Sequence, residues 1–152
     1  MKKLSLAFFV FAFFLMTACS SEEECGACFT PPNYFLFDLV DKDSGENVFA
    51  NGRYSSDDIE VLDASDHPVE FEFISYEDLN VIEIRTIGWQ TEIVNYRINI
   101  AMENIFDLYV DAERLSEDCC SFTRYNEIEI SNAEFSLSTE TGVYTIIVDR
   151  AD

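Results

Sequence analysis

The sequence predicts an all-β protein built as an antiparallel β-sandwich of about seven to nine strands. Apolar and polar residues alternate with a period of two along much of the chain, which is the pattern of half-buried strands. Short turn-forming stretches such as DKDSGEN, SDHP and TETG separate the alternating segments. Many short strands joined by tight turns are typical of two packed sheets.

Six segments alternate clearly, and their apolar residues are expected to face the core. They are 34–40, 69–75, 81–87, 95–102, 125–131 and 143–149, and two weaker strands are expected near 58–63 and 133–138. In the third segment the pattern places Ile82 and Ile84 inward and Glu83 outward. In the fourth it places Met102 on the inward face with Ile100.

Residues 104–118 suit either a helix or a strand. The helix face would contain Ile105, Leu108, Ala112 and Leu115, and the strand face Phe106, Leu108, Val110 and Ala112. The aromatic and β-branched content favours the strand. The chain has no internal repeat and no linker rich in Pro, Gly or Ser, so we expect one sandwich domain, immunoglobulin-like or transthyretin-like.

The first eighteen residues have the pattern of a targeting signal. Lys2 and Lys3 precede an apolar run, 4–16, in which only Ser5 is polar. This run is shorter than the roughly 20 residues of a membrane-spanning helix, so we expect residues 1–18 to be removed rather than to join the fold.

Residues 15–19, LMTAC, resemble the lipobox of bacterial lipoprotein signal peptides. The resemblance implies that the mature chain begins at Cys19 and that its thiol carries a diacylglyceryl group. The chain would then be anchored in a membrane by lipid without spanning it. An ordinary secretory signal with a cysteine at the cut by chance is the alternative.

The next five residues, Ser20, Ser21, Glu22, Glu23 and Glu24, resemble the acidic signal that sends lipoproteins of the Bacteroidetes to the outer face of the outer membrane. The resemblance implies an outer-membrane location facing the cell exterior. A solvated acidic spacer is the alternative interpretation.

The expected division of the chain is a signal peptide at 1–18, a lipidated acidic tether at 19–28 and a single sandwich domain at 29–152. Segment 28–54, especially VDKDSGENVF, resembles a loose set of small, uncharacterised lipoproteins of flavobacteria. This resemblance implies a location and a sandwich-type fold, and it implies no activity.

The charge of the mature chain limits its partners. Removal of residues 1–18 leaves seven Lys and Arg against thirty Asp and Glu, a net charge of −23. Nucleic acid is excluded as a partner because phosphate binding needs a basic face. An anionic membrane surface would also repel the domain.

Four cysteines follow Cys19: Cys25, Cys28, Cys119 and Cys120. An even number in an exported chain predicts disulfides. Because a bond between neighbours would close a strained ring, we expect the first two cysteines to be joined to the last two, in either pairing. A redox pair in CGAC and a four-cysteine zinc site are the rival interpretations; the FTPP after CGAC and the spacing of CC argue against them.

Four further residues are weak site candidates. Asp41 and Asp43 in DKDSGEN faintly resemble a calcium loop, but the bidentate acid of an EF-hand is missing and an acidic turn is the better interpretation. The only histidine, His67, is expected in a surface turn. Trp89 in IGWQT is expected at a hairpin tip, where it could stack on a sugar ring or close the end of the sandwich.

No catalytic constellation is recognisable, so we expect a non-catalytic structural or interaction module without a cofactor. A glycan-binding accessory lipoprotein and a hydrolase without a recognisable motif are the alternatives. The expected partners are the membrane, through the lipid on Cys19, and a protein or glycan that the sequence does not identify.

Overall fold

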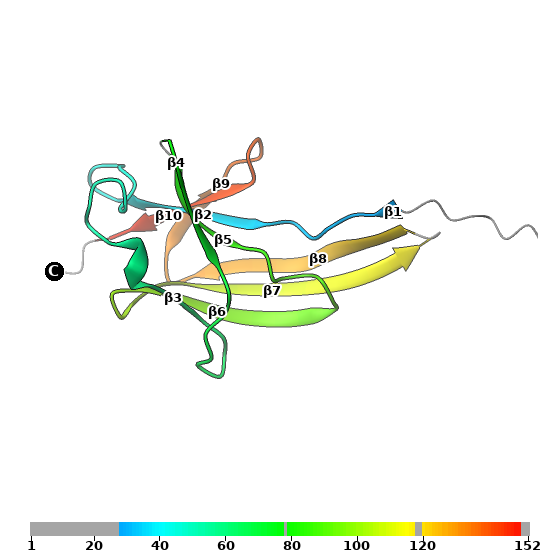
Figure 1. The fold of residues 1–152 in the computed structure, drawn as a ribbon. Helices are drawn as coiled ribbons and strands as arrows, with labels where there is room; N and C mark the ends of the chain where they lie inside the picture. The colour runs from blue at the N-terminus through cyan, green and yellow to red at the C-terminus, as the bar shows by residue number, and fades with distance from the viewer. Residues whose placement is uncertain (1–27, 78, 118–119, 150–152) are drawn as a thin grey trace, which may run out of the picture.

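The computed structural model describes residues 28–77, 79–117 and 120–149, and it confirms an all-β sandwich of two five-stranded sheets (Figure 1). In spatial order, the first sheet contains β1 (Cys28–Phe29), β8 (Cys120–Ser131), β7 (Glu103–Glu117), β6 (Glu92–Ile100) and β3 (Ile59–Leu62). The second contains β4 (Glu72–Tyr76), β5 (Leu79–Ile84), β2 (Phe35–Asp41), β10 (Val143–Val148) and β9 (Glu134–Leu137). One 3-10 turn, Ser56–Asp58, precedes β3. Within the described ranges no helix has the length and apolar character needed to cross a membrane.

The expected antiparallel arrangement holds for six of the eight strand pairings, and two pairings are parallel. β10 runs parallel to β2, and β1 runs parallel to β8. Parallel neighbours need a long connection, and β2 and β10 are separated by most of the described chain. The described residues form ten strands rather than seven to nine, partly because the two-residue β1 is too short to show any periodicity.

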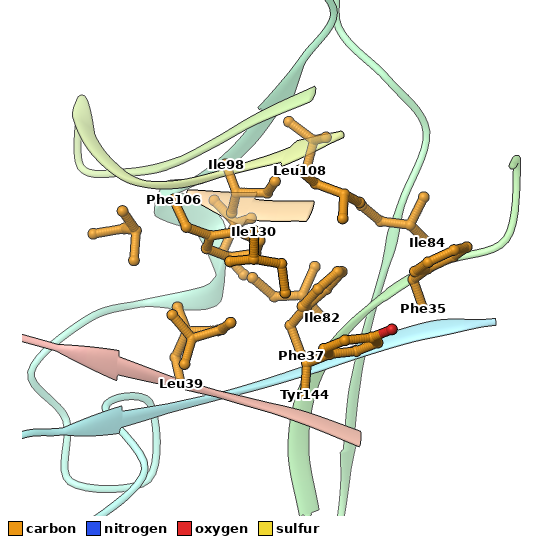
Figure 2. Packing of buried hydrophobic residues seen from close by; sticks show 14 of the residues in the cluster. Phe35, Phe37, Leu39, Ile82, Ile84, Ile98, Phe106, Leu108, Ile130 and Tyr144 are labelled. Carbon is orange, nitrogen blue, oxygen red and sulfur yellow. The ribbon is translucent and has the colours of Figure 1, made fainter. Parts of the chain in front are cut away.

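The core lies between the sheets and is built by alternating strand residues (Figure 2). In β2, Phe35, Phe37 and Leu39 are buried while the residues between them are partly exposed, as a period of two predicts. The ring centroid of Phe37 lies 4.9 Å from that of Phe106 in β7. Residues 104–117 lie in β7, which confirms the choice of strand over helix for the described part of 104–118.

Two expected orientations are wrong. Met102 is 98 % exposed because β6 ends at Ile100, and Ala101 and Met102 form the tight turn to β7, both with positive φ. Glu83 is only 3 % exposed, although alternation places it on the outer face of β5. The guanidinium of Arg85 lies over that face and ion-pairs with the Glu83 carboxylate.

The first sheet extends beyond the second at one end (Figure 1). β7 has 15 residues and β8 has 12, whereas no strand of the second sheet exceeds seven. We name the projecting part, residues 112–117 and 120–125, the arm; it begins at the register shift after Asp111. β1 lies beside the first residues of β8 at the end of the arm.

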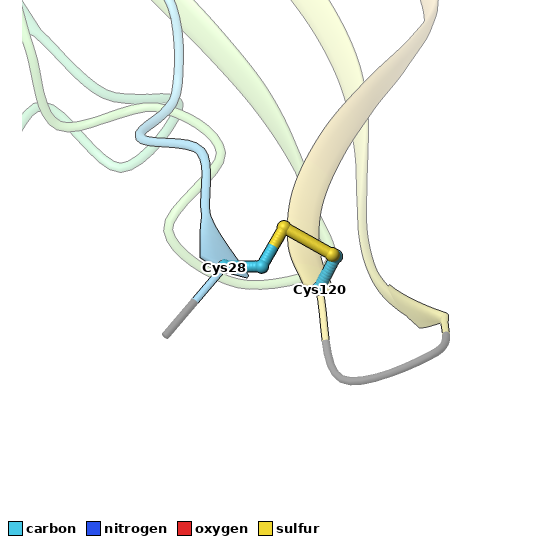
Figure 3. Close-up of a disulfide and its surroundings, with 2 residues drawn as sticks. All are labelled: Cys28 and Cys120. Carbon is cyan, nitrogen blue, oxygen red and sulfur yellow. A yellow bond between two sulfur atoms is a disulfide. The ribbon is translucent and has the colours of Figure 1, made fainter. Parts of the chain in front are cut away.

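A disulfide joins Cys28 to Cys120 at the end of the arm (Figure 3). The two Cα atoms are 4.5 Å apart, and the residues are separated by 92 positions in the sequence. The bond confirms one link between the N-terminal and the later cysteines. Cys25 and Cys119 lie outside the described residues, so a second bond between them stays a prediction.

We expect the double variant Cys28→Ser, Cys120→Ser to lose about 4 kcal/mol of unfolding free energy, because the unfolded chain is no longer closed into a long loop. Both the variant and its reference carry Cys25→Ser and Cys119→Ser, so that no second bond can close a similar loop, and urea unfolding of the oxidised proteins measures the loss. Equal stability of the two proteins would contradict the expectation.

Candidate functional site

Trp89 does not lie at a hairpin tip, contrary to the sequence-based expectation. The strand before it, β5, belongs to the second sheet, and the strand after it, β6, belongs to the first. The residues between them, 85–91, therefore cross from one sheet to the other. This crossing places Trp89 beside the arm and β1 rather than at the end of a two-stranded ribbon.

The indole of Trp89 is half exposed and held in one orientation. Its Nε1 donates a hydrogen bond of 2.8 Å to the backbone carbonyl of Arg85. Its ring stacks on Phe29 of β1, with ring centroids 6.1 Å apart and ring planes 26° apart. Because 51 % of Trp89 is still exposed, the site presents a fixed aromatic surface to solvent.

A cleft of about 270 Å³ lies next to this indole. Its lining residues come from the chain before and within β4, from β5 and from the crossing segment: Glu70, Phe71, Glu72, Glu83, Arg85, Thr86 and Trp89. An aromatic side chain and a small number of convergent polar groups are the usual components of a binding pocket.

The polar part of the cleft is organised by Arg85. Its guanidinium pairs with the buried carboxylate of Glu83 and, at 3.0 Å, with the exposed carboxylate of Glu72. It also lies over the ring of Tyr34, 5.1 Å from the centroid. The hydrogen bond with Glu83 raises the pKa of Arg85 above its usual value, which keeps the guanidinium charged. The cleft thus presents one exposed carboxylate, that of Glu72, beside a guanidinium held in place by two ion pairs.

Gly88 fixes the crossing segment against the arm. Its N–H donates to Glu92 Oε1 at 2.7 Å, and its carbonyl accepts from Thr123 Oγ1 at 2.6 Å. Its φ of +93° lies in a region that favours glycine. The fit to the arm is close, since a Cβ here would lie 2.8 Å from Thr123 Cγ2 and 2.9 Å from the Tyr125 hydroxyl oxygen.

The segment after β1 is held along the arm by hydrogen bonds, and Arg114 of the arm also contacts Phe29. Arg114 Nη1 donates to the carbonyl of Thr30 at 2.9 Å, and its guanidinium lies 5.0 Å from the Phe29 ring centroid. The backbone N–H of Asn33 donates to the Tyr125 hydroxyl at 3.0 Å. Burial raises the pKa of Tyr125, which favours the protonated hydroxyl. Phe29 also follows Cys28 directly, so the disulfide helps to hold the ring under Trp89.

The other sequence candidates do not join this site. Asp41 is buried and organises its own turn: Oδ1 accepts from the N–H groups of Asp43 and Ser44, and Oδ2 accepts from Arg53 at 2.8 Å. In the part of the chain that the structure describes, no three His, Cys, Asp or Glu residues are grouped so that they could hold a metal ion. The His67 side chain is 76 % exposed and lies 3.5 Å from Asp63.

Three other clefts among the described residues are larger, with volumes of about 390, 500 and 330 Å³, and the first two have less directed chemistry. One, of about 390 Å³, is lined by Lys42, whose ammonium is paired with Asp149 at 2.7 Å. The other, of about 500 Å³, includes Ile128, Leu137 and Tyr144 between β8 and the β9–β10 edge. Neither combines a fixed exposed aromatic ring with paired donors and acceptors as the Trp89 cleft does.

Comparison with protein-family models, with curated proteins and with solved structures finds no match for this chain. The site is therefore interpreted from its own geometry. Of its supporting residues, Phe29 has no distinguishing sequence pattern. Gly88 has only its adjacency to Trp89 as a signal.

We expect Gly88→Ala to lower the free energy of unfolding by at least about 2 kcal/mol more than Gly142→Ala, because overpacking adds to backbone strain. Gly142 is the matched control, since its φ is +72° and a Cβ there would meet nothing within 4 Å. Urea unfolding of both variants measures the difference. Equal losses would show that Thr123 and Tyr125 yield freely to the new methyl group.

Proposed function

We propose that the chain is a lipid-anchored lipoprotein of the outer membrane, facing the cell exterior, and that its sandwich is a non-catalytic interaction module. The observation that most strongly supports this proposal is the disulfide between Cys28 and Cys120. Disulfides persist in oxidising compartments and are rare in the cytosol. The bond therefore supports the export that LMTAC and SSEEE imply.

The position of the disulfide in the sequence implies a short tether between a lipid on Cys19 and the folded domain. Cys28 lies nine residues after Cys19, and a fully extended chain of that length spans at most about 30 Å. A lipid on Cys19 would hold the end of the arm near the membrane. The turn at Met102, at the opposite end of the first sheet, would then point away from it (Figure 1).

The chemistry of the Trp89 cleft supports binding rather than catalysis. The carboxylates of Glu72 and Glu83 are both paired with Arg85, which orients the exposed Glu72 carboxylate as a hydrogen-bond acceptor. The rigid aromatic wall supplies contact area at low cost in conformational entropy. His67 is not among the residues that line the cleft.

We expect Cys19→Ser to abolish lipid attachment and to release the protein from membranes, because the thiol is the acceptor of the diacylglyceryl group. A Bacteroidetes host grown with a clickable fatty acid, followed by membrane fractionation, measures both effects. Ser20→Ala is the matched control and should keep label and membrane. Equal labelling of Cys19→Ser and the wild type would refute the anchor.

We expect replacement of Glu22, Glu23 and Glu24 by alanine to keep the lipid but to leave the protein on the periplasmic face. Digestion of intact cells by an added protease measures exposure at the surface. Replacement of three exposed acids of the domain, Glu127, Glu129 and Glu140, removes the same charge and should leave exposure unchanged. If the first variant is digested as readily as the wild type, the acidic run is only a spacer.

A further inference from the structure

We propose that the cleft beside Trp89 binds a neutral pyranose ring of a glycan. The proposal rests on the proposed function, because it names the partner class of that interaction module. Its three requirements are a fixed aromatic surface, polar groups that suit hydroxyls, and a charge that rejects acidic sugars.

Trp89 meets the first requirement. A pyranose has a flat face of C–H groups, which packs on an indole, and a rim of hydroxyls, which does not. The indole is already immobilised by its hydrogen bond to the Arg85 carbonyl and by its stack on Phe29. A sugar that packs on the exposed part of the ring therefore orders no further side chain on the protein.

The opposite part of the cleft meets the second requirement. Hydroxyl groups both donate and accept hydrogen bonds. The exposed carboxylate of Glu72 is an acceptor, and the half-exposed guanidinium of Arg85, which the buried Glu83 carboxylate holds in place, is a donor. The volume of about 270 Å³ lies just under the roughly 300 Å³ minimum of pockets for drug-sized ligands, which suits one sugar ring with the rest of the glycan in solvent.

The charge of the lining meets the third requirement. Glu70, Glu72 and Glu83 face one cation, Arg85, so the lining carries an excess of negative charge. The whole chain is also strongly acidic. Uronic acids, sialic acids and sulfated sugars would be repelled, whereas neutral hexoses and pentoses carry no charge to be opposed.

The disulfide couples to this site through a single residue. Phe29 is covalently adjacent to Cys28, and its ring is the support on which Trp89 stacks. Loss of the bond between Cys28 and Cys120 would leave β1 attached to the arm only by its short strand pairing and by Arg114, and would loosen that support. Sugar binding should therefore weaken when the disulfide is removed, even in protein that stays folded.

The test uses the full lipoprotein, extracted from membranes in detergent and titrated calorimetrically. The probes are neutral gluco-, manno-, galacto- and xylo-oligosaccharides, an oligogalacturonate as the acidic probe and chitosan oligomers as the cationic probe. We expect at least one neutral probe to bind, the oligogalacturonate not to bind, and Trp89→Ala to weaken the affinity at least tenfold.

Two further variants keep the test decisive if Trp89→Ala folds poorly. Glu72→Ala removes an exposed carboxylate from the cleft and should weaken binding several-fold without loss of stability. Tyr76→Ala removes an exposed aromatic ring that does not line the cleft, and it should bind as the wild type does.

Three results would overturn the proposal: no binding of any neutral probe, unchanged binding by both Trp89→Ala and Glu72→Ala, or binding of charged probes only. Fatty-acid labelling of Cys19 in the same preparation separates this outcome from failure of the proposed function. If the protein carries the fatty acid but binds no sugar, the sugar-binding proposal is wrong and the proposed lipid anchor still holds.

Discussion

The packing of β2 against β7, through the ring contact of Phe37 and Phe106, is the interaction on which the rest of the structure depends. β2 is the central strand of its sheet, and β7 is the central strand of the other. Each sheet has one apolar face, and water is excluded from that face only when the other sheet packs on it. Because β7 and β8 are much longer than β2, this packing leaves their distal residues beyond the second sheet.

That overhang accounts for the candidate site. The arm contacts two irregular segments, one after β1 and one between β5 and β6, and the second sheet reaches it only at its base, where Phe35 of β2 packs on Tyr125. Irregular backbone has donors and acceptors that a sheet ladder does not satisfy, and Thr123, Tyr125 and Arg114 supply partners for them. The half-exposed indole of Trp89 belongs to the segment between β5 and β6 and faces solvent there.

The sequence predicts the strands well because alternation is a signal within each segment. It predicts the site poorly because the site is formed by residues that are distant in the sequence. Alternation identifies the core residues of β2, and aromatic and β-branched content identifies β7 as a strand. The parallel pairing of β2 with β10 has no local signal. Glu83 obeys alternation and is buried all the same, since Arg85 covers it. Trp89 is a candidate from its residue type and an expected hairpin-tip position that is wrong, whereas its stack on Phe29 follows from a crossing between sheets that no turn pattern encodes.

The disulfide also determines how a mechanical load on the N-terminal end enters the fold. Without it, a pull on the chain before Cys28 would be carried by the two residue pairs of β1 and then by the chain that leads to β2 and the core. With it, the force passes to Cys120, the first residue of β8, and runs along the strand axis. The hydrogen bonds between β8 and β7 then resist together in shear rather than opening one after another. In a domain held in this way, a pulling force is borne by one covalent bond and by the hydrogen bonds between β7 and β8. The hydrophobic core then carries little of the load.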